Sequence, residues 1–313
     1  MREMIYLFDG QGAFRPGIGK ELCARYPKAD AMIDRSTVVL GYDLREYLWG
    51  DKAVETSSKT SVAQPAISAV SLAYAEVLRE HGIEGAISLG HSLGEATAII
   101  YCGILSFDDG MRMIKKRGEV MEEGGGKGTM MAVLNVGLAD LQDMCREVTD
   151  ELSEPAVVAN INAPNQIVIS GSQETVKKVA QRVAKKQGRS IPLNVGGAWH
   201  SPFLQNASLE FSRFLDDLQF RKPERKFYSV VEQRILDDPQ DIKDALKKQM
   251  LSQVDWVAAI EGLEAKERFF LEVGPSKILR DLVVRIGSVT EVESTALHGE
   301  LETLVNVLKK WRN

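Results

Sequence analysis

The chain contains few of the residues that mark metal-binding, disulfide-linked or membrane-spanning proteins. Its 313 residues include three cysteines and four histidines. The cysteines, Cys23, Cys102 and Cys145, match no metal or redox spacing, so we expect them to be small apolar residues in a reducing compartment. No apolar run reaches the roughly 18 residues that a transmembrane helix needs, and "MREMIYLFDGQG" at the N-terminus resembles no signal segment. We therefore expect a cytoplasmic protein with no membrane partner, no metal and no other cofactor.

An excess of basic residues is also missing. The chain has 39 Lys and Arg against 44 Asp and Glu, a formal net charge of −5, which disfavours nucleic acid as its main partner. Hydrophobic residues make up 44% of the chain and charged residues 27%, the ordinary balance of a globular protein. No repeat or low-complexity segment is visible. This length can bury the core of one large domain or of two modest ones.

A glycine-flanked serine is the first feature that indicates chemistry. In "ISLGHSLGEATAII", residues 87–100, Ser92 stands between Gly90 and Gly94, with a strand-like run before it and a helix-like run after it. This G-x-S-x-G pattern is typical of a nucleophile elbow, a sharp turn that lifts the serine hydroxyl clear of the backbone. A Cβ at either glycine would collide where the chain doubles back. The same pattern also occurs as a simple turn, so its meaning depends on the residues that accompany it.

The first 127 residues alternate between strand and helix patterns. The strand is expected at 3–8, a loop follows it at "DGQGAFRPG", and helices are expected within 17–50 and at 64–82 and 106–124. Ser106 is the expected N-cap of the last helix. The glycine-rich "GGGKG" at 124–128 predicts a hinge.

After this hinge the pattern becomes βαββαβ, which is typical of a ferredoxin-like unit. Strands are expected at 129–136, 156–162, 166–172 and 189–195, and helices at 138–152 and 173–188. We predict an α/β fold in which residues 128–196 form a small domain inserted into a larger one, built from residues 1–127 and 197–313. The larger domain would close with a strand at 268–275 and C-terminal helices. A cleft between two domains is a usual place for a substrate.

Only four histidines could serve a serine nucleophile as its base. His81 ends a predicted helix and His298 lies in a polar stretch, so we expect both at the surface. His91 adjoins Ser92, and neighbouring residues on a turn usually point apart. His200, in the glycine-rich "GGAWHSPF" where the chain leaves the small domain, is the best base candidate, although a loop histidine alone is more often structural. No convincing acid is found to orient it, so a backbone carbonyl is the alternative partner.

A set of short motifs resembles the malonyl-CoA:acyl carrier protein transacylases and the acyltransferase domains of polyketide synthases. The matching segments are "FDGQGAF" (8–14), "QPAISA" (64–69), "GHSLGE" (90–95), "RGEVM" (117–121), "NAPNQIVISG" (162–171), "GAWHSPF" (197–203), "QMLSQVDW" (249–256) and "EVGPSKIL" (272–279). Each is weak alone, but their order and spacing over nearly the whole chain are specific. The resemblance implies an α/β-hydrolase-like large domain with a ferredoxin-like insertion.

The resemblance also implies catalytic roles. Ser92 would be the nucleophile that becomes acylated, and His200 would be its base. The backbone carbonyl of Gln249 would orient His200 in place of an acid. The backbone N–H groups of Gln11 and Leu93 would form the oxyanion hole that stabilises the tetrahedral intermediate.

Substrate-binding roles follow from the same resemblance. Arg117 would form a two-point salt bridge to the free carboxylate of a malonyl group, which the guanidinium fork matches geometrically. Gln64 and His91 would line the site, although packing or structural roles fit them equally. Without the resemblance, Arg117 is typical of a solvated helix residue, Gln11 of a turn residue and Gln249 of a surface helix residue.

Three positions depart from the usual family pattern. Asp9 and Phe14 stand where Pro and Gln are common in the first loop. An acid beside the oxyanion loop would alter local electrostatics, and Phe14 removes a polar side chain. Trp199 is bulkier than the usual Phe, so we expect it to shrink the acyl pocket and favour a small acyl group.

The implied reaction is ping-pong transfer of a malonyl group from malonyl-CoA, through a Ser92 acyl-enzyme, to the phosphopantetheine thiol of an acyl carrier protein. Carrier proteins are typically acidic, so the basic segments 177–189 and 221–226 are candidate docking surfaces, although an ordinary solvated face fits either one. Two other functions stay open. An acyl-thioester hydrolase that clears carrier-bound chains would not need Arg117, and a non-catalytic carrier-binding subunit would not need Ser92, His200 and Gln11.

Overall fold

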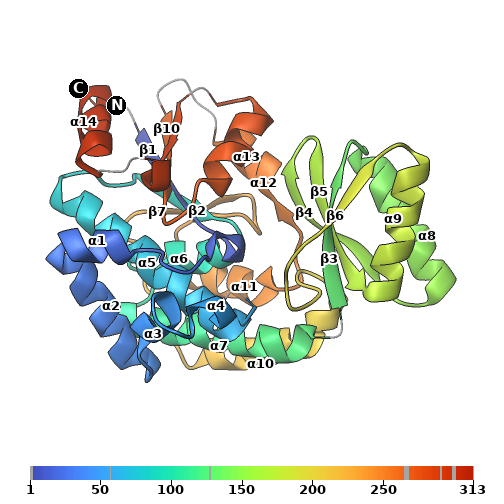
Figure 1. Cartoon of the computed structure of the whole chain (residues 1–313), viewed down its shortest axis with the longest axis horizontal. Coiled ribbons are helices and arrows are strands. Elements are labelled where there is room, and N and C mark those ends of the chain that lie inside the picture. Colours follow the sequence, from blue (N-terminus) through green and yellow to red (C-terminus); the bar gives the residue numbers. More distant parts are fainter. Residues whose placement is uncertain are drawn as a thin grey trace.

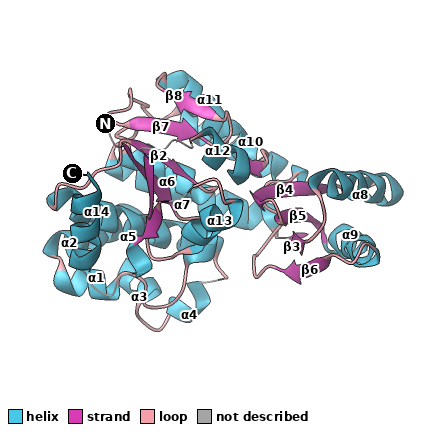
Figure 2. Cartoon of the chain, turned by 90° about the horizontal axis from the view of Figure 1, so that it is seen from above, coloured by secondary structure: helices cyan, strands magenta, loops and turns pink. Residues whose placement is uncertain are grey.

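The computed structural model describes residues 3–56, 58–126, 128–263, 268–289, 291–297 and 301–312. Its strands form two sheets with helices packed around each, which confirms the predicted α/β fold class (Figure 1). Figure 2 shows the same division from above, with the chain termini on the side of the larger sheet and the smaller sheet toward the opposite end.

The larger sheet has six strands in the order β11-β10-β1-β2-β7-β8, parallel except for the β7–β8 pair. They are β1 (Glu3–Phe8), β2 (Ile87–Gly90), β7 (Lys226–Ser229), β8 (Arg234–Leu236), β10 (Arg268–Val273) and β11 (Val292–Ser294). Alternate residues of β1 enter two different cores, Tyr6 and Phe8 on one face and Ile5 and Leu7 on the other. Burial on both faces explains why β1 is a continuous apolar run.

The helices around this sheet carry most of the larger core. They are α1 (Lys20–Arg25), α2 (Pro27–Leu40), α3 (Leu44–Leu48), α4 (Ala53–Thr56), α5 (Thr60–Glu80), α6 (Leu93–Tyr101), α7 (Phe107–Gly125), α10 (Gln205–Asp216), α11 (Pro239–Gln249), α12 (Trp256–Gly262), α13 (Ile278–Ile286) and α14 (Leu301–Arg312), with 3-10 turns η1 (Gln11–Ala13), η2 (Pro202–Leu204) and η3 (Thr295–Leu297). The Ser106 hydroxyl accepts a hydrogen bond from Asp109 N, as expected of an N-cap. Helix α5 begins at Thr60 rather than Gln64, so Pro65 lies inside it. Among the described helices, none is long and apolar enough to cross a membrane.

The smaller sheet has the order β6-β3-β5-β4-β9. Its elements are β3 (Gly128–Leu134), α8 (Leu138–Leu152), β4 (Ala156–Ala163), β5 (Gln166–Ser172), α9 (Gln173–Lys185), β6 (Arg189–Pro192) and β9 (Val254–Asp255). The first six follow the predicted βαββαβ order. The predicted strand at 189–195 ends at Pro192, and the two-residue strand β9, which pairs with β4, has no strand signal of its own. Figure 1 shows α8 and α9 on the face of this sheet away from the larger one.

Candidate active site

Ser92 lies at the sharp turn between β2 and α6. Its backbone has φ 54° and ψ −101°, a conformation that non-glycine residues rarely adopt. The flanking glycines are required by close backbone contacts. A Cβ on Gly90 would lie 2.0 Å from the carbonyl carbon of Gly94, and a Cβ on Gly94 would lie 1.9 Å from the carbonyl oxygen of Phe8. The turn therefore has the strained geometry of a nucleophile elbow.

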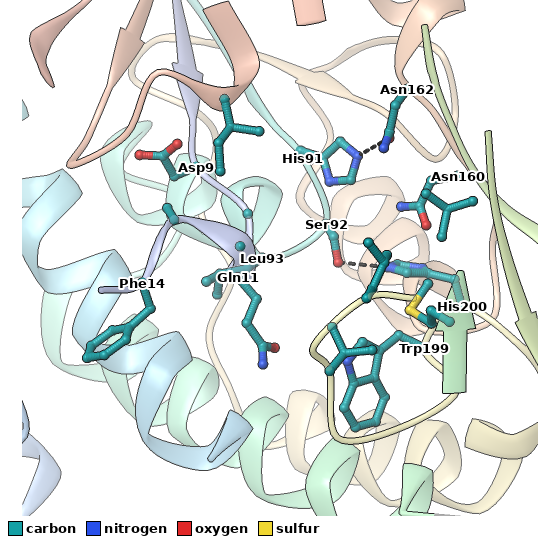
Figure 3. A pocket seen from close by; sticks show the side chains of 18 of the residues that line it. Asp9, Gln11, Phe14, His91, Ser92, Leu93, Asn160, Asn162, Trp199 and His200 are labelled. Atoms are coloured by element: carbon teal, nitrogen blue, oxygen red, sulfur yellow. Dashed lines mark hydrogen bonds between the residues drawn. The ribbon is translucent and has the colours of Figure 1, made fainter. Parts of the chain in front are cut away.

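His200 contacts the serine directly. Its Nε2 lies 2.7 Å from Ser92 Oγ (Figure 3). Its Nδ1 faces two backbone carbonyl oxygens, that of Gln249 at 3.1 Å and that of Ser252 at 2.9 Å. Because carbonyl oxygens can only accept, Nδ1 carries the hydrogen and Nε2 presents a lone pair to the serine hydroxyl. The Ser252 carbonyl was not predicted, since a backbone acceptor leaves no mark in the sequence.

The surroundings of His200 keep it neutral. Burial, followed by the positive charge of Arg117 and the neighbouring His91, lowers the pKa of His200 to about 3. The imidazole is therefore unprotonated at neutral pH and can accept a proton from Ser92.

Arg117 is fully buried, so its interpretation as a solvated helix residue is wrong. Its Nη2 donates to Ser92 Oγ at 3.2 Å, and its Nη1 donates to Gln64 Oε1 at 2.8 Å. Its Nε and Nη2 both donate to Gln249 Oε1, at 3.1 and 2.8 Å. Burial lowers the pKa of Arg117 to about 10, which leaves the guanidinium charged at neutral pH. A buried cation thus lies beside the serine with only neutral oxygens as direct partners in the described structure.

Gln249 connects these groups to a buried acid. Its Nε2 donates to Glu95 Oε2 at 2.6 Å and to the backbone carbonyl of Ser92 at 3.0 Å. Glu95 Oε1 in turn accepts from Ser229 Oγ and Val230 N, both at 2.9 Å. Glu95 was not singled out from the sequence, although it stands three residues after Ser92 on the buried helix α6. Glu95 interacts favourably with the charge of the Arg117 guanidinium, so it is the candidate counter-charge for this buried cation.

Gln11 and Leu93 begin η1 and α6, where the first backbone N–H groups have no partner within the helix. Figure 3 shows both beside Ser92. The Gln11 side chain is fixed to α5, because its Nε2 donates to Thr60 Oγ1 at 2.9 Å and its Oε1 accepts from Gln64 Nε2 at 3.3 Å. The loop that carries Gln11 is therefore anchored to α5.

A cavity of about 450 Å³ opens at Ser92. Its wall includes Gln11, Gln64, His91, Ser92, Leu93, Arg117, Trp199 and His200, together with Met121, Met130, Asn160, Asn162, Leu193, Ile278 and Leu282. The asparagines and methionines were not singled out from the sequence, because a single such residue in a strand or helix carries no distinctive signal. Gln249 is buried behind this wall rather than at the surface.

Trp199 and the glycine-rich segment before β3 pack against each other. A Cβ on Gly125 would lie 1.9 Å from Trp199 Cζ3, so glycine at this position makes room for the indole. Trp199 is 5% exposed and lines the cavity. Phe14, by contrast, points away from Ser92 in Figure 3. Both aromatic departures from the family pattern line the cavity, and the effect of Trp199 on the acyl pocket stays a prediction.

The other histidines have different partners. His91 Nε2 lies 2.9 Å from Asn162 Oδ1, and burial lowers the pKa of His91 (Figure 3). His81 is half-buried rather than exposed, with Nδ1 2.8 Å from the Val77 carbonyl. His298 lies outside the described residues. Among the described histidines, His200 is the one that contacts Ser92.

The fold and these contacts define the class: an α/β protein in which a half-buried serine at a strand-to-helix turn contacts a buried histidine and a buried arginine. Residues 5–308 match the family model described as acyl transferase domain, so the chain belongs to that family. Within it, the chain belongs to the malonyl CoA-acyl carrier protein transacylases. It is 33% identical to the protein of that name from Bacillus subtilis (strain 168), over 99% of this chain and 98% of the relative.

Solved structures agree with this assignment. A malonyl CoA-acyl carrier protein transacylase from Clostridium perfringens is 30% identical, with a TM-score of 0.90 over 99% of this chain and 97% of that one. A malonyl-transacylase in complex with its type II PKS acyl-carrier protein is 27% identical, with a TM-score of 0.92 over 97% of this chain and 99% of that one.

Proposed function

We propose that this chain moves a malonyl group from malonyl-CoA to the phosphopantetheine thiol of an acyl carrier protein through an acyl-enzyme at Ser92. The observation that carries the proposal is the pair of contacts at one oxygen: Ser92 Oγ lies 2.7 Å from a neutral histidine nitrogen and 3.2 Å from a guanidinium nitrogen. The first contact suits an activated nucleophile, and the second suits an acyl group that carries its own carboxylate.

In the first half-reaction Ser92 Oγ attacks the thioester carbonyl while its proton passes to His200 Nε2. The N–H groups of Gln11 and Leu93 bind the oxygen that becomes negative. The C–S bond then breaks, and the departing thiolate takes the proton from His200. In the second half-reaction the carrier thiol gives its proton to His200 and attacks the serine ester. The C–O bond breaks, and the proton returns to Ser92.

Arg117 fits the role of the malonyl anchor. A carboxylate that enters a buried cavity loses hydration and needs a charged partner. The guanidinium supplies one already oriented by Gln64 and Gln249. Once Ser92 is acylated, its Oγ is an ester oxygen and accepts hydrogen bonds less well than the free hydroxyl. The Nη2–H of Arg117 is then released to the malonyl carboxylate. An acetyl group could not use this contact.

We also propose that residues 128–196 act as an inserted domain within residues 1–127 and 197–313, and that its basic segment 177–189 contacts the carrier. Much of that segment is already neutralised. Lys178, Arg182 and Lys186 form ion pairs with acids of α8. Lys177, Lys185 and Arg189 have no ion pair within the described ranges, and they are the charges that an acidic carrier would meet. In the second basic segment, 221–226, Arg225 and Lys226 pair with Glu84 and Glu3.

The experiment is a transfer assay with malonyl-CoA and a phosphopantetheinylated carrier, in which malonyl-carrier and free malonate are measured together. We expect malonyl-carrier to form faster than malonate and both to vanish in Ser92→Ala. Malonate without malonyl-carrier would favour the hydrolase. Carrier binding without either product would favour the non-catalytic subunit.

A further inference from the structure

A second buried polar cluster lies behind the oxyanion loop. Asp9, between β1 and η1, is 1% exposed, Glu272 on β10 is 0% exposed and Ser276, in the turn before α13, is 1% exposed. Ser276 Oγ lies 2.6 Å from Asp9 Oδ1 and 2.7 Å from Glu272 Oε1. Figure 3 shows the Asp9 carboxyl pointing away from Ser92, so this cluster does not take part in the chemistry directly.

The hydrogens in this cluster can be counted. A serine hydroxyl has one hydrogen and two lone pairs. One lone pair of Ser276 Oγ accepts from Ile278 N at 3.2 Å. The single hydroxyl hydrogen can serve only one of the two carboxyl oxygens. The other carboxyl must then donate a hydrogen of its own to the remaining lone pair, so one of the two acids is protonated.

The partners of the two acids indicate where that proton resides. Glu272 Oε2 accepts from the backbone N–H of Arg280 at 2.7 Å, a bond that favours a carboxylate. Asp9 Oδ2 has no hydrogen-bond partner in the described structure and lies against Gly274, where a Cβ would be 2.1 Å away. Burial first, and the charge of Glu272 second, raise the pKa of Asp9 well above its usual range. The proton is therefore on Asp9.

We propose that Asp9 is a positioning residue for the oxyanion loop and acts as a neutral acid, sharing one proton with Glu272 through the Ser276 hydroxyl. This inference rests on the proposed acyl transfer. Asp9 stands two residues before Gln11, whose backbone N–H is a proposed oxyanion donor. The Gln11 side chain holds the loop to α5, and the Asp9 side chain holds the same loop to the segment after β10. Because Ser276 Oγ also accepts from Ile278 N, the cluster fixes the start of α13, whose residues line the cavity.

Loss of the shared proton would break the hydrogen bonds between Asp9, Ser276 and Glu272, because two carboxylates would then face one another in a buried site. The charged and titratable groups on the surrounding elements are Glu272 on β10, Tyr74 on α5, His91 after β2, Arg15 in the loop after η1 and Arg280 on α13. Arg15 and Arg280 have their own partners, the Pro275 carbonyl and Asp281. Neither arginine forms an ion pair with Asp9 in the described structure.

The test compares Asp9→Ala with Asp9→Asn, and uses Asp51→Asn, an exposed acid, as the matched control. Asparagine can still donate to Ser276 and cannot ionise. We expect Asp9→Ala to lower kcat/KM about tenfold, the effect of one net hydrogen bond, and equally for malonyl-CoA and acetyl-CoA. Asp9→Asn should recover most of that loss at neutral pH. Ser276→Ala should reproduce the Asp9→Ala loss if the alanine variant at position 9 does not fold.

A second readout does not depend on activity. Infrared spectra at pH 7 are compared between wild type and each variant. The carbonyl band of a neutral carboxylic acid should be lost in Asp9→Asn and retained in Asp51→Asn. Absence of that band, or equal losses of kcat/KM in Asp9→Asn and Asp9→Ala, would overturn the proposal. A band that is present in a chain without transfer activity would leave Asp9 neutral and refute the proposed function instead.

Discussion

Two buried polar networks flank the nucleophile, and they satisfy their charges in different ways. The network of Arg117, Gln249 and Glu95 holds a cation and an acid separated by one amide, and each of the donor groups described above has an acceptor. The network of Asp9, Ser276 and Glu272 holds two acids, and both hydrogen bonds to Ser276 Oγ can form only if one acid keeps a proton. In the proposed mechanism, the first network supports a site that must stay charged to bind an anion. The second supports a loop that needs only a fixed shape.

The largest effect is expected where the first network meets the nucleophile. His200→Ala removes the base that the Gln249 carbonyl orients, so transfer should fall about 10²–10⁴-fold, the usual contribution of general acid–base catalysis. Gln249→Ala keeps the backbone carbonyl and should cost less in kcat, while it disturbs Arg117. Rates of acyl transfer from single-turnover kinetics would check this. A larger loss in His91→Ala, in a folded variant, would mean that the wrong histidine has been assigned.

Arg117→Ala should lower kcat/KM more for malonyl-CoA than for acetyl-CoA, whereas Asp9→Ala should lower both equally. Without the guanidinium the malonyl carboxylate loses charge-assisted hydrogen bonds, so the malonyl-to-acetyl preference in kcat/KM should narrow about ten- to a hundredfold. Arg117→Lys keeps a positive charge without the planar fork and should lie between wild type and alanine. Equal losses for the two donors would mean that Arg117 supports only the fold.

The pH dependence of stability should have opposite signs at His200 and at Asp9. The folded-state pKa of His200 is lowered, so its contribution to stability is present above the unfolded pKa and is lost as the pH falls from about 6.5 toward 3. The folded-state pKa of Asp9 is raised, so stability is lost as the pH rises above the unfolded value of about 3.9.

Chemical unfolding between pH 4 and pH 9 would measure both contributions. The free energy of unfolding of Asp9→Asn should exceed that of wild type by an amount that grows with pH, with a slope of at most about 1.4 kcal/mol per pH unit. His200→Asn should remove the decline at acid pH. An Asp9→Asn curve parallel to that of wild type would show that Asp9 is ionised in the folded protein.

The smallest effect is expected at the surface. Charge reversal at Lys185 and Arg189 should raise the KM for the carrier a few-fold and leave acylation by malonyl-CoA unchanged, since exposed charges contribute little each. The effect should shrink with added salt, which screens charges over about 8–10 Å at physiological ionic strength. Lys310→Glu, on α14 at the opposite end of the molecule in Figure 1, is the matched control. Unchanged carrier kinetics at low salt would move the docking surface to residues 221–226.

The strands and helices were largely predictable because burial leaves a period in the sequence. The run at 3–8 is apolar on both faces, and it forms the centre of the sheet. Ser92 was predictable for a different reason, since only glycines fit beside it. Strand β9 was not, because two residues have no period.

The polar networks were less predictable because their partners are distant in the chain. Arg117 bonds to Gln249, 132 residues away, and Ser276 bonds to Asp9, 267 residues away. None of these residues carries a local signal of burial. Without the resemblance, Arg117 is therefore typical of a solvated helix residue. The protonation of Asp9 needs three atoms in place at once, and no pattern along the chain encodes that.

The most direct test of the acyl-enzyme is the mass of the protein after brief mixing with malonyl-CoA, with the modified peptide sequenced. The proposed mechanism predicts one malonyl group per chain, attached to the peptide that contains Ser92, absent in Ser92→Ala and removed when a phosphopantetheinylated carrier is added. A malonyl group on another residue, or transfer to the carrier at the wild-type rate in Ser92→Ala, would contradict it.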